Sequence, residues 1–217
     1  AIRNYLEIGS VDKDQLNRQM QEHTQGLNRA GKATDYIVQI LNRQRYLLDQ
    51  FGKNFKSSNY NSLSSTDRKA FILSLIALTY PIVYDLLIAL SQGFKVQNQI
   101  NKQFINEKVK TIYGSNRTVD VAIDAMLPMI IELGVIKRER VSIYSLGYQQ
   151  NILHKYVAEL IVYTDIKLSG SKSILSDDIG QRPWYGYFNI EDLMPVQWTY
   201  LLQEKDSSIG KAYITTK

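Results

Sequence analysis

The fold prediction rests on residues 104–144, which read FINEKVKTIYGSNRTVDVAIDAMLPMIIELGVIKRERVSIY. Apolar residues recur at helical spacing on both sides of a break at residues 113–116, Tyr-Gly-Ser-Asn. The first set is Ile105, Val109 and Ile112, and the second is Val119, Ala122, Ile123, Met126, Leu127 and Ile130. Residues 132–138, ELGVIKR, then lead into a short basic segment. The stretch predicts a helix, a tight turn, a second helix and a hairpin.

This order of elements resembles the winged helix-turn-helix family, whose second helix commonly ends in a phrase like L-x-E-x-G-V-I-x-R. Such modules most often bind duplex DNA with the second helix in the major groove. Here that helix would be residues 118–127, with its N-terminus near Asn116. The resemblance implies that the residues at the start of this helix and in the wing contact bases or phosphates. These DNA-binding residues are Asn116, Arg117, Thr118, Lys137, Arg138 and Arg140.

One feature of the second helix opposes DNA binding. Asp120 and Asp124 lie on the side that the apolar stripe leaves free, where they would repel phosphates. Winged helices also serve as protein-docking modules. The sequence therefore leaves two functions open, which are DNA binding and a helical scaffold whose winged unit docks a partner protein.

Composition bounds the chemistry of the 217-residue chain. It has no cysteine, so disulfides, thiol nucleophiles and cysteine-zinc sites are excluded, and its two histidines, His23 and His154, are far apart. No glycine-rich phosphate loop is present, because residues 114–117 lack the Gly-Lys-Ser/Thr ending. We expect a protein that is not an enzyme and carries no cofactor or metal. The net charge of +5 favours polyanionic partners.

A second basic set lies in the N-terminal third and includes Arg43 and Arg45. We predict a helix from Tyr36 to about Phe51, with these arginines on its polar side. They would contact the DNA backbone and widen the footprint of the wing. The alternative is an ordinary solvated helix face.

Residues 70–90, AFILSLIALTYPIVYDLLIAL, are long enough for a transmembrane helix. Pro81 near the middle and Asp85 oppose that reading. We expect two buried core helices, or one helix kinked at Pro81. Together with the cysteine-free composition, this favours a cytoplasmic protein with no membrane partner.

The C-terminal third begins with a predicted helix at residues 151–168. An aromatic segment follows at residues 182–188, RPWYGYF, which could stack on bases but is better explained as a core edge. The acidic pairs Asp177-Asp178 and Glu191-Asp192 could hold magnesium, although capping or solvation explains them as well.

We predict a mainly α fold: a helical bundle with an embedded winged helix-turn-helix and a small irregular aromatic-rich C-terminal region. The predicted regions are residues 1–95, 96–149 and 150–217, with one compact domain as the alternative. Over residues 35–144, the order of elements is similar to the BrxA-like small DNA-binding proteins of BREX phage defence. This resemblance implies a non-enzymatic, DNA-binding component of a multi-protein regulatory or phage-defence complex.

Overall fold

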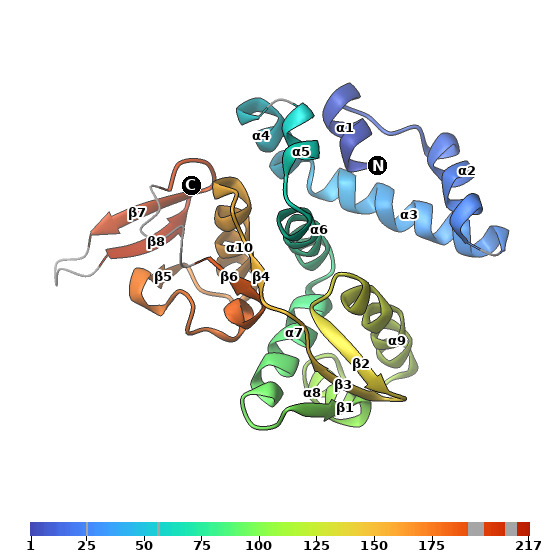
Figure 1. Cartoon of the computed structure of the whole chain (residues 1–217), viewed down its shortest axis with the longest axis vertical. Coiled ribbons are helices and arrows are strands. Elements are labelled where there is room, and N and C mark those ends of the chain that lie inside the picture. Colours follow the sequence, from blue (N-terminus) through green and yellow to red (C-terminus); the bar gives the residue numbers. More distant parts are fainter. Residues whose placement is uncertain (25, 56, 191–197, 207–211) are drawn as a thin grey trace. The chain divides into compact units, whose positions relative to one another are not determined.

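The computed structural model describes residues 1–24, 26–55, 57–190, 198–206 and 212–217 (Figure 1). The fold is mainly α, as predicted. The chain divides into two compact units, Ala1–Leu63 and Ser64–Lys217. This division differs from the regions predicted to end at residues 95 and 149. The reason is packing within the second unit, where the apolar segment at residues 70–90 contacts both the helix before Gly114 and the helix that follows the hairpin.

In its described residues, the first unit contains only helices. They are α1 (Ile2–Ile8), α2 (Lys13–His23), α3 (Leu27–Arg43), α4 (Arg45–Asn54) and α5 (Ser57–Ser62). The Asp12 side chain caps α2 by accepting hydrogen bonds from the backbone N–H groups of Asp14 and Gln15. The small core includes Tyr5, Leu16, Ala30, Leu41, Leu47, Leu48 and Phe51.

The helix predicted at residues 36–51 is wrong in its bounds. The structure has two helices there, because α3 starts nine residues earlier, at Leu27, and ends at Arg43. Gln44 leaves the helical region (φ −102°, ψ 20°), and α4 starts at Arg45. Leu41, Leu47 and Leu48 are nevertheless buried, so the two helices still share an apolar side.

The apolar segment of the second unit forms two core helices, α6 (Ser65–Thr79) and α7 (Pro81–Phe94). Pro81 starts α7, where its missing N–H costs nothing, and the chain turns at Tyr80. The two-helix alternative is therefore confirmed. Asp85 is half-buried and accepts a hydrogen bond from the Tyr113 hydroxyl (2.5 Å).

None of the described helices is alone long and apolar enough to cross a membrane. Taken together, α6 and α7 reach the required length and composition, but they are bent by 116° at the break between them.

The stretch from α7 to β3, residues 81–146, is called the α7–β3 module below. After α7 it contains β1 (Gln99–Asn101), α8 (Lys102–Tyr113), α9 (Arg117–Glu132), β2 (Ile136–Arg140) and β3 (Ile143–Leu146). The strands form an antiparallel sheet in the order β1-β3-β2. Both predicted helices, the turn and the hairpin are present, but the second helix, predicted at residues 118–127, continues to Glu132. The short strand β1 was not predicted.

The helix predicted at residues 151–168 starts later, as α10 (Lys155–Leu168). Gln150–Asn151 instead form β4, which pairs in parallel with β6 (Phe188–Asn189). The buried Asp67 carboxylate accepts the backbone N–H groups of Leu153 (3.0 Å) and His154 (3.1 Å). These two residues are thereby held outside the helix.

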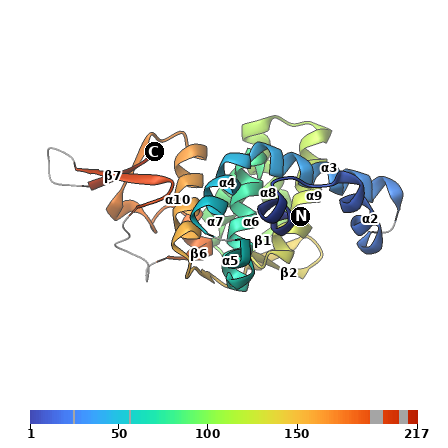
Figure 2. The same ribbon diagram turned by 90° about the horizontal axis from the view of Figure 1, so that it is seen from above.

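The described residues after α10 include a small sheet and two short turns. The sheet is antiparallel in the order β5-β8-β7, from β5 (Ser173–Leu175), β7 (Leu202–Asp206) and β8 (Ala212–Thr216). The 3-10 turns are η1 (Ser176–Asp178) and η2 (Pro183–Tyr187). In both views, β7 and the α7–β3 module lie on opposite sides of α10 (Figures 1 and 2).

The aromatic segment of η2 and β6 belongs to the core, as predicted. Trp184, Tyr185, Tyr187 and Phe188 are buried, and the Trp184 indole N–H donates to the Ile161 carbonyl (3.1 Å). With their faces covered, these rings cannot stack on bases.

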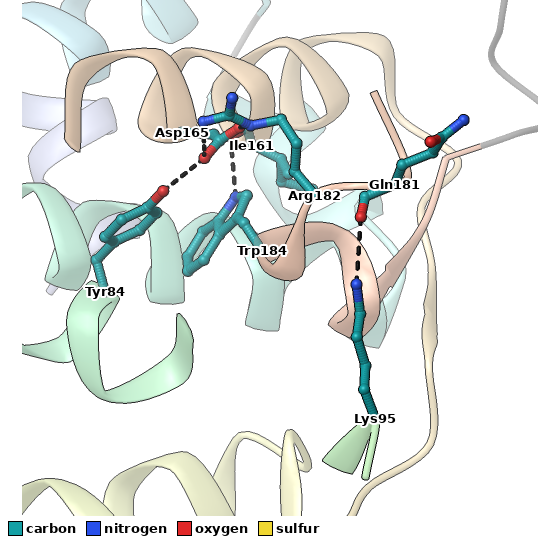
Figure 3. A network of polar contacts seen from close by, with 7 residues as sticks. All are labelled: Tyr84, Lys95, Ile161, Asp165, Gln181, Arg182 and Trp184. Atoms are coloured by element: carbon teal, nitrogen blue, oxygen red, sulfur yellow. Dashed lines mark hydrogen bonds and ion pairs between the residues drawn. The ribbon is translucent and has the colours of Figure 1, made fainter. Parts of the chain in front are cut away.

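A buried polar network ties this segment to the central helices (Figure 3). Asp165 of α10 accepts hydrogen bonds from the Tyr84 hydroxyl (2.6 Å) and from Arg182 Nε (2.6 Å). Burial, together with the hydrogen bond to Asp165, raises the pKa of Tyr84 well above its ordinary value. Tyr84 therefore stays a neutral donor, and the network links α7, α10 and η2.

Candidate nucleic-acid interface

The turn between α8 and α9 positions the first candidate residues. Gly114 has φ +83°, a left-handed conformation that glycine adopts without strain, and it ends α8. Asn116 then caps α9, because its Oδ1 accepts the backbone N–H of Val119 (3.0 Å). This oxygen is thus engaged in starting the helix. Arg117 and Thr118 occupy the exposed first turn of α9.

One side of α9 packs on the module and the other faces solvent. Val119, Ile123, Leu127 and Ile130 are buried. The exposed residues Arg117, Val121, Ala125 and Pro128 follow at intervals of four, four and three residues. They form a single stripe along the helix, which we call the α9 stripe.

The two aspartates that opposed DNA binding are ion-paired with α8. Asp120 Oδ1 lies 2.7 Å from Lys110 Nζ, and Asp124 pairs with Lys102. Such partly exposed pairs add little to stability, but each lysine offsets the charge of its carboxylate. The predicted repulsion of phosphate is thereby reduced. The lysines lie ten or more positions from their partners, so no short-range pattern could have found these pairs.

The basic residues of the hairpin lie on different faces of the sheet. One face carries Ile136, Arg138 and Tyr144, the residue of β3 that pairs with Arg138. The other face carries Lys137, which pairs with Ser145. Lys137 Nζ sits 3.6 Å from the centre of the Tyr148 ring, a cation–π contact. Sequence reasoning did not single out Tyr148. The alternation of strand residues could have separated Lys137 from Arg138.

Arg140 lies at an irregularity near the hairpin tip. The register of β2 and β3 shifts between Arg138 and Arg140, and Ser142 in the turn has a positive φ of 60°. Arg140 and Val141 are both exposed. The tip of the hairpin thus exposes the Arg140 side chain to solvent.

A groove of about 420 Å³ separates α9 from the hairpin. Its apolar lining comes from Leu127, Pro128, Ile131 and Tyr144. Arg138 and the Lys102–Asp124 ion pair also line it. Arg138 therefore faces the space between the helix and the hairpin rather than the outer side of the sheet.

Arg43 and Arg45 belong to the first unit, at the end of α3 and the start of α4. Both are exposed, and Arg45 Nε lies 3.6 Å from Asp49. The remaining candidates, Asn116, Arg117, Thr118, Lys137, Arg138 and Arg140, all lie in the α7–β3 module. The candidate residues thus form one set in the module and a separate pair in the first unit.

The described residues contain no group of three or more histidine, aspartate or glutamate side chains that could hold a metal ion. Asp177 and Asp178 are exposed on η1. Glu191 and Asp192 lie outside the described residues.

Comparison with known proteins finds no matching family model, no similar curated protein and no similar solved structure.

Proposed function

We propose that the α7–β3 module is a winged helix-turn-helix that binds duplex DNA without catalysing a reaction. The order helix, strand, helix, helix, strand, strand and the sheet order β1-β3-β2 support this assignment. The observation that carries the proposal is the charge balance of α9. Its two aspartates are paired with lysines, whereas exposed Arg117 has no ion-pair partner among the described residues.

The proposed binding relies mainly on phosphate contacts. The N-terminus of α9 has backbone N–H groups without helical partners, and these favour an anion. Arg117 at the same end can also reach a guanine edge in the major groove. The hairpin residues Lys137, Arg138 and Arg140 would contact the backbone on either side of the wing. Such an interface tolerates many sequences.

The test is equilibrium binding of a labelled duplex over a range of salt concentrations. We expect Arg117→Gln to weaken binding about tenfold. The triple variant Lys137→Gln/Arg138→Gln/Arg140→Gln should weaken it further and reduce the slope of log K against log salt by about 2.7, since each lost phosphate contact removes about 0.9.

Lys205→Gln, a charge-matched change in β7, should leave affinity nearly unchanged. Unaltered binding by the arginine and hairpin variants would contradict the proposal, as would a wild-type protein that binds no duplex at low salt.

The second candidate is a helical scaffold whose module docks a partner protein. The apolar lining of the groove between α9 and the hairpin favours it. A protein partner that binds without competing with duplex DNA would support this alternative, provided that its binding is lost in the Ile131→Glu variant. On either proposal, the order of elements over residues 35–144 is similar to that of the BrxA-like proteins. This similarity supports placing the chain in a regulatory or phage-defence complex of the BREX type.

A further inference from the structure

The α9 stripe changes chemistry after its first residue. Arg117 can donate hydrogen bonds, but the next three positions, Val121, Ala125 and Pro128, have side chains with neither donor nor acceptor. Val121 is 59% exposed, although valine is usually buried. The acidic side chains beside the stripe, Asp120 and Asp124, are paired with lysines of α8. Beyond the first turn, the stripe would present a mainly apolar surface to a DNA groove.

Only one feature of the major groove is recognised by an apolar side chain, and that is the 5-methyl group of thymine. Guanine, cytosine and adenine present acceptors and amino groups, which Val121 and Ala125 cannot satisfy. Arg117 can contact the O6 and N7 atoms of guanine with two hydrogen bonds. The stripe therefore combines one guanine-reading residue with an adjoining methyl-reading surface.

We infer that α9 recognises a guanine through Arg117 and a nearby thymine methyl through Val121. Four helical residues rise by about 6 Å, and base pairs are about 3.4 Å apart, so the two contacts are about two base pairs apart. This inference rests on the proposed DNA binding and adds a limited sequence preference to it. It assigns Val121, which the charge pattern alone does not point to, as a specificity-determining residue.

The test uses two short duplexes of identical mixed sequence, one containing thymine and one containing deoxyuracil at every thymine position. The substitution removes only methyl groups, and it removes all of them, so the duplexes can be compared wherever the protein binds along them. Wild-type protein should bind the thymine duplex about fourfold more tightly, which is the effect of burying one methyl group. Val121→Ser should bind both duplexes equally.

Val141→Ser is the matched control, because Val141 is also an exposed valine but lies at the hairpin tip. It should keep the preference for thymine. A third duplex with 7-deazaguanine lacks the N7 acceptor but keeps O6, so wild-type protein should bind it about threefold more weakly, with no such loss in Arg117→Gln.

The outcomes separate this inference from the function on which it rests. Wild-type protein that binds both the thymine and the deoxyuracil duplex equally overturns the inference and leaves DNA binding intact. An equal loss of preference in Val121→Ser and Val141→Ser also overturns it. Failure to bind any duplex at low salt overturns the proposed function and the inference together.

Discussion

At the scale of single residues, Glu159 is a buried carboxylate whose partners are all backbone N–H groups in the hydrogen bonds that the structure describes. It is fully buried in α10, and its carboxylate accepts hydrogen bonds from four consecutive backbone N–H groups, those of residues 199–202, at 2.6–3.2 Å. Glu159→Gln would turn an amide donor toward these N–H groups. We expect the free energy of unfolding to fall by about 3 kcal/mol, measured by urea denaturation.

The control for Glu159→Gln is Glu132→Gln, the same change at an exposed position near the end of α9. It should alter the free energy of unfolding by less than about 0.5 kcal/mol. Similar stability losses in the two variants would show that the four hydrogen bonds do not hold the 199–202 segment in place.

At the scale of elements, the end of β3 closes the α7–β3 module through a backbone contact. Gly147 N–H donates to the Val135 carbonyl (2.9 Å), and a Cβ at this position would lie 2.1 Å from the Gly134 oxygen. Gly147→Ala therefore forces β3 away from the junction of α9 and β2. We expect a loss of about 3 kcal/mol in stability and weaker duplex binding, measured on the same protein by thermal unfolding and titration.

The matched substitution is Gly31→Ala within α3, where the added methyl group meets no atom within 4 Å apart from its chain neighbours and the backbone of its own helix. It should stabilise its helix by about 1 kcal/mol. A Gly147→Ala protein as stable as wild type would contradict the close approach of these two backbone segments.

The sequence predicts an element correctly where its formation depends on residues that are close together in the chain, and fails where it depends on distant ones. Local signals were sufficient for α8, the turn at Gly114, α9 and the hairpin. The spacing of apolar residues and the residues that favour turns can both be read from short stretches of sequence. They failed at Gln44, where no proline or glycine marks the break between α3 and α4. They also failed at residues 151–154, where a distant carboxylate, Asp67, holds the chain outside the helix.

The candidate site shows the same limit. The start of α9 was predicted from sequence to within one residue, at residue 118 rather than at Arg117. The sequence could not predict that Lys110 pairs with Asp120 and Lys102 with Asp124, because this pairing depends on how the two helices cross. The sequence therefore shows the two acidic side chains of α9 but not the lysines that pair with them.

At the scale of the whole molecule, the division at Leu63 separates the two sets of candidate DNA contacts. Residues 64–217 contain the complete α7–β3 module and the buried core around α6 and α10. We expect a fragment of these residues to unfold cooperatively and to bind duplex DNA. If Arg43 and Arg45 contact phosphates in the full chain, the slope of log K against log salt should be smaller in magnitude for the fragment by about 1.8.

The double variant Arg43→Gln/Arg45→Gln of the full chain isolates these two charges from the rest of the first unit. If they contact phosphates, its salt slope should equal that of the fragment, because both proteins lose the same two contacts. A double variant with the slope of the wild-type chain would assign Arg43 and Arg45 to an ordinary solvated helix surface. The DNA interface would then consist of the α7–β3 module alone.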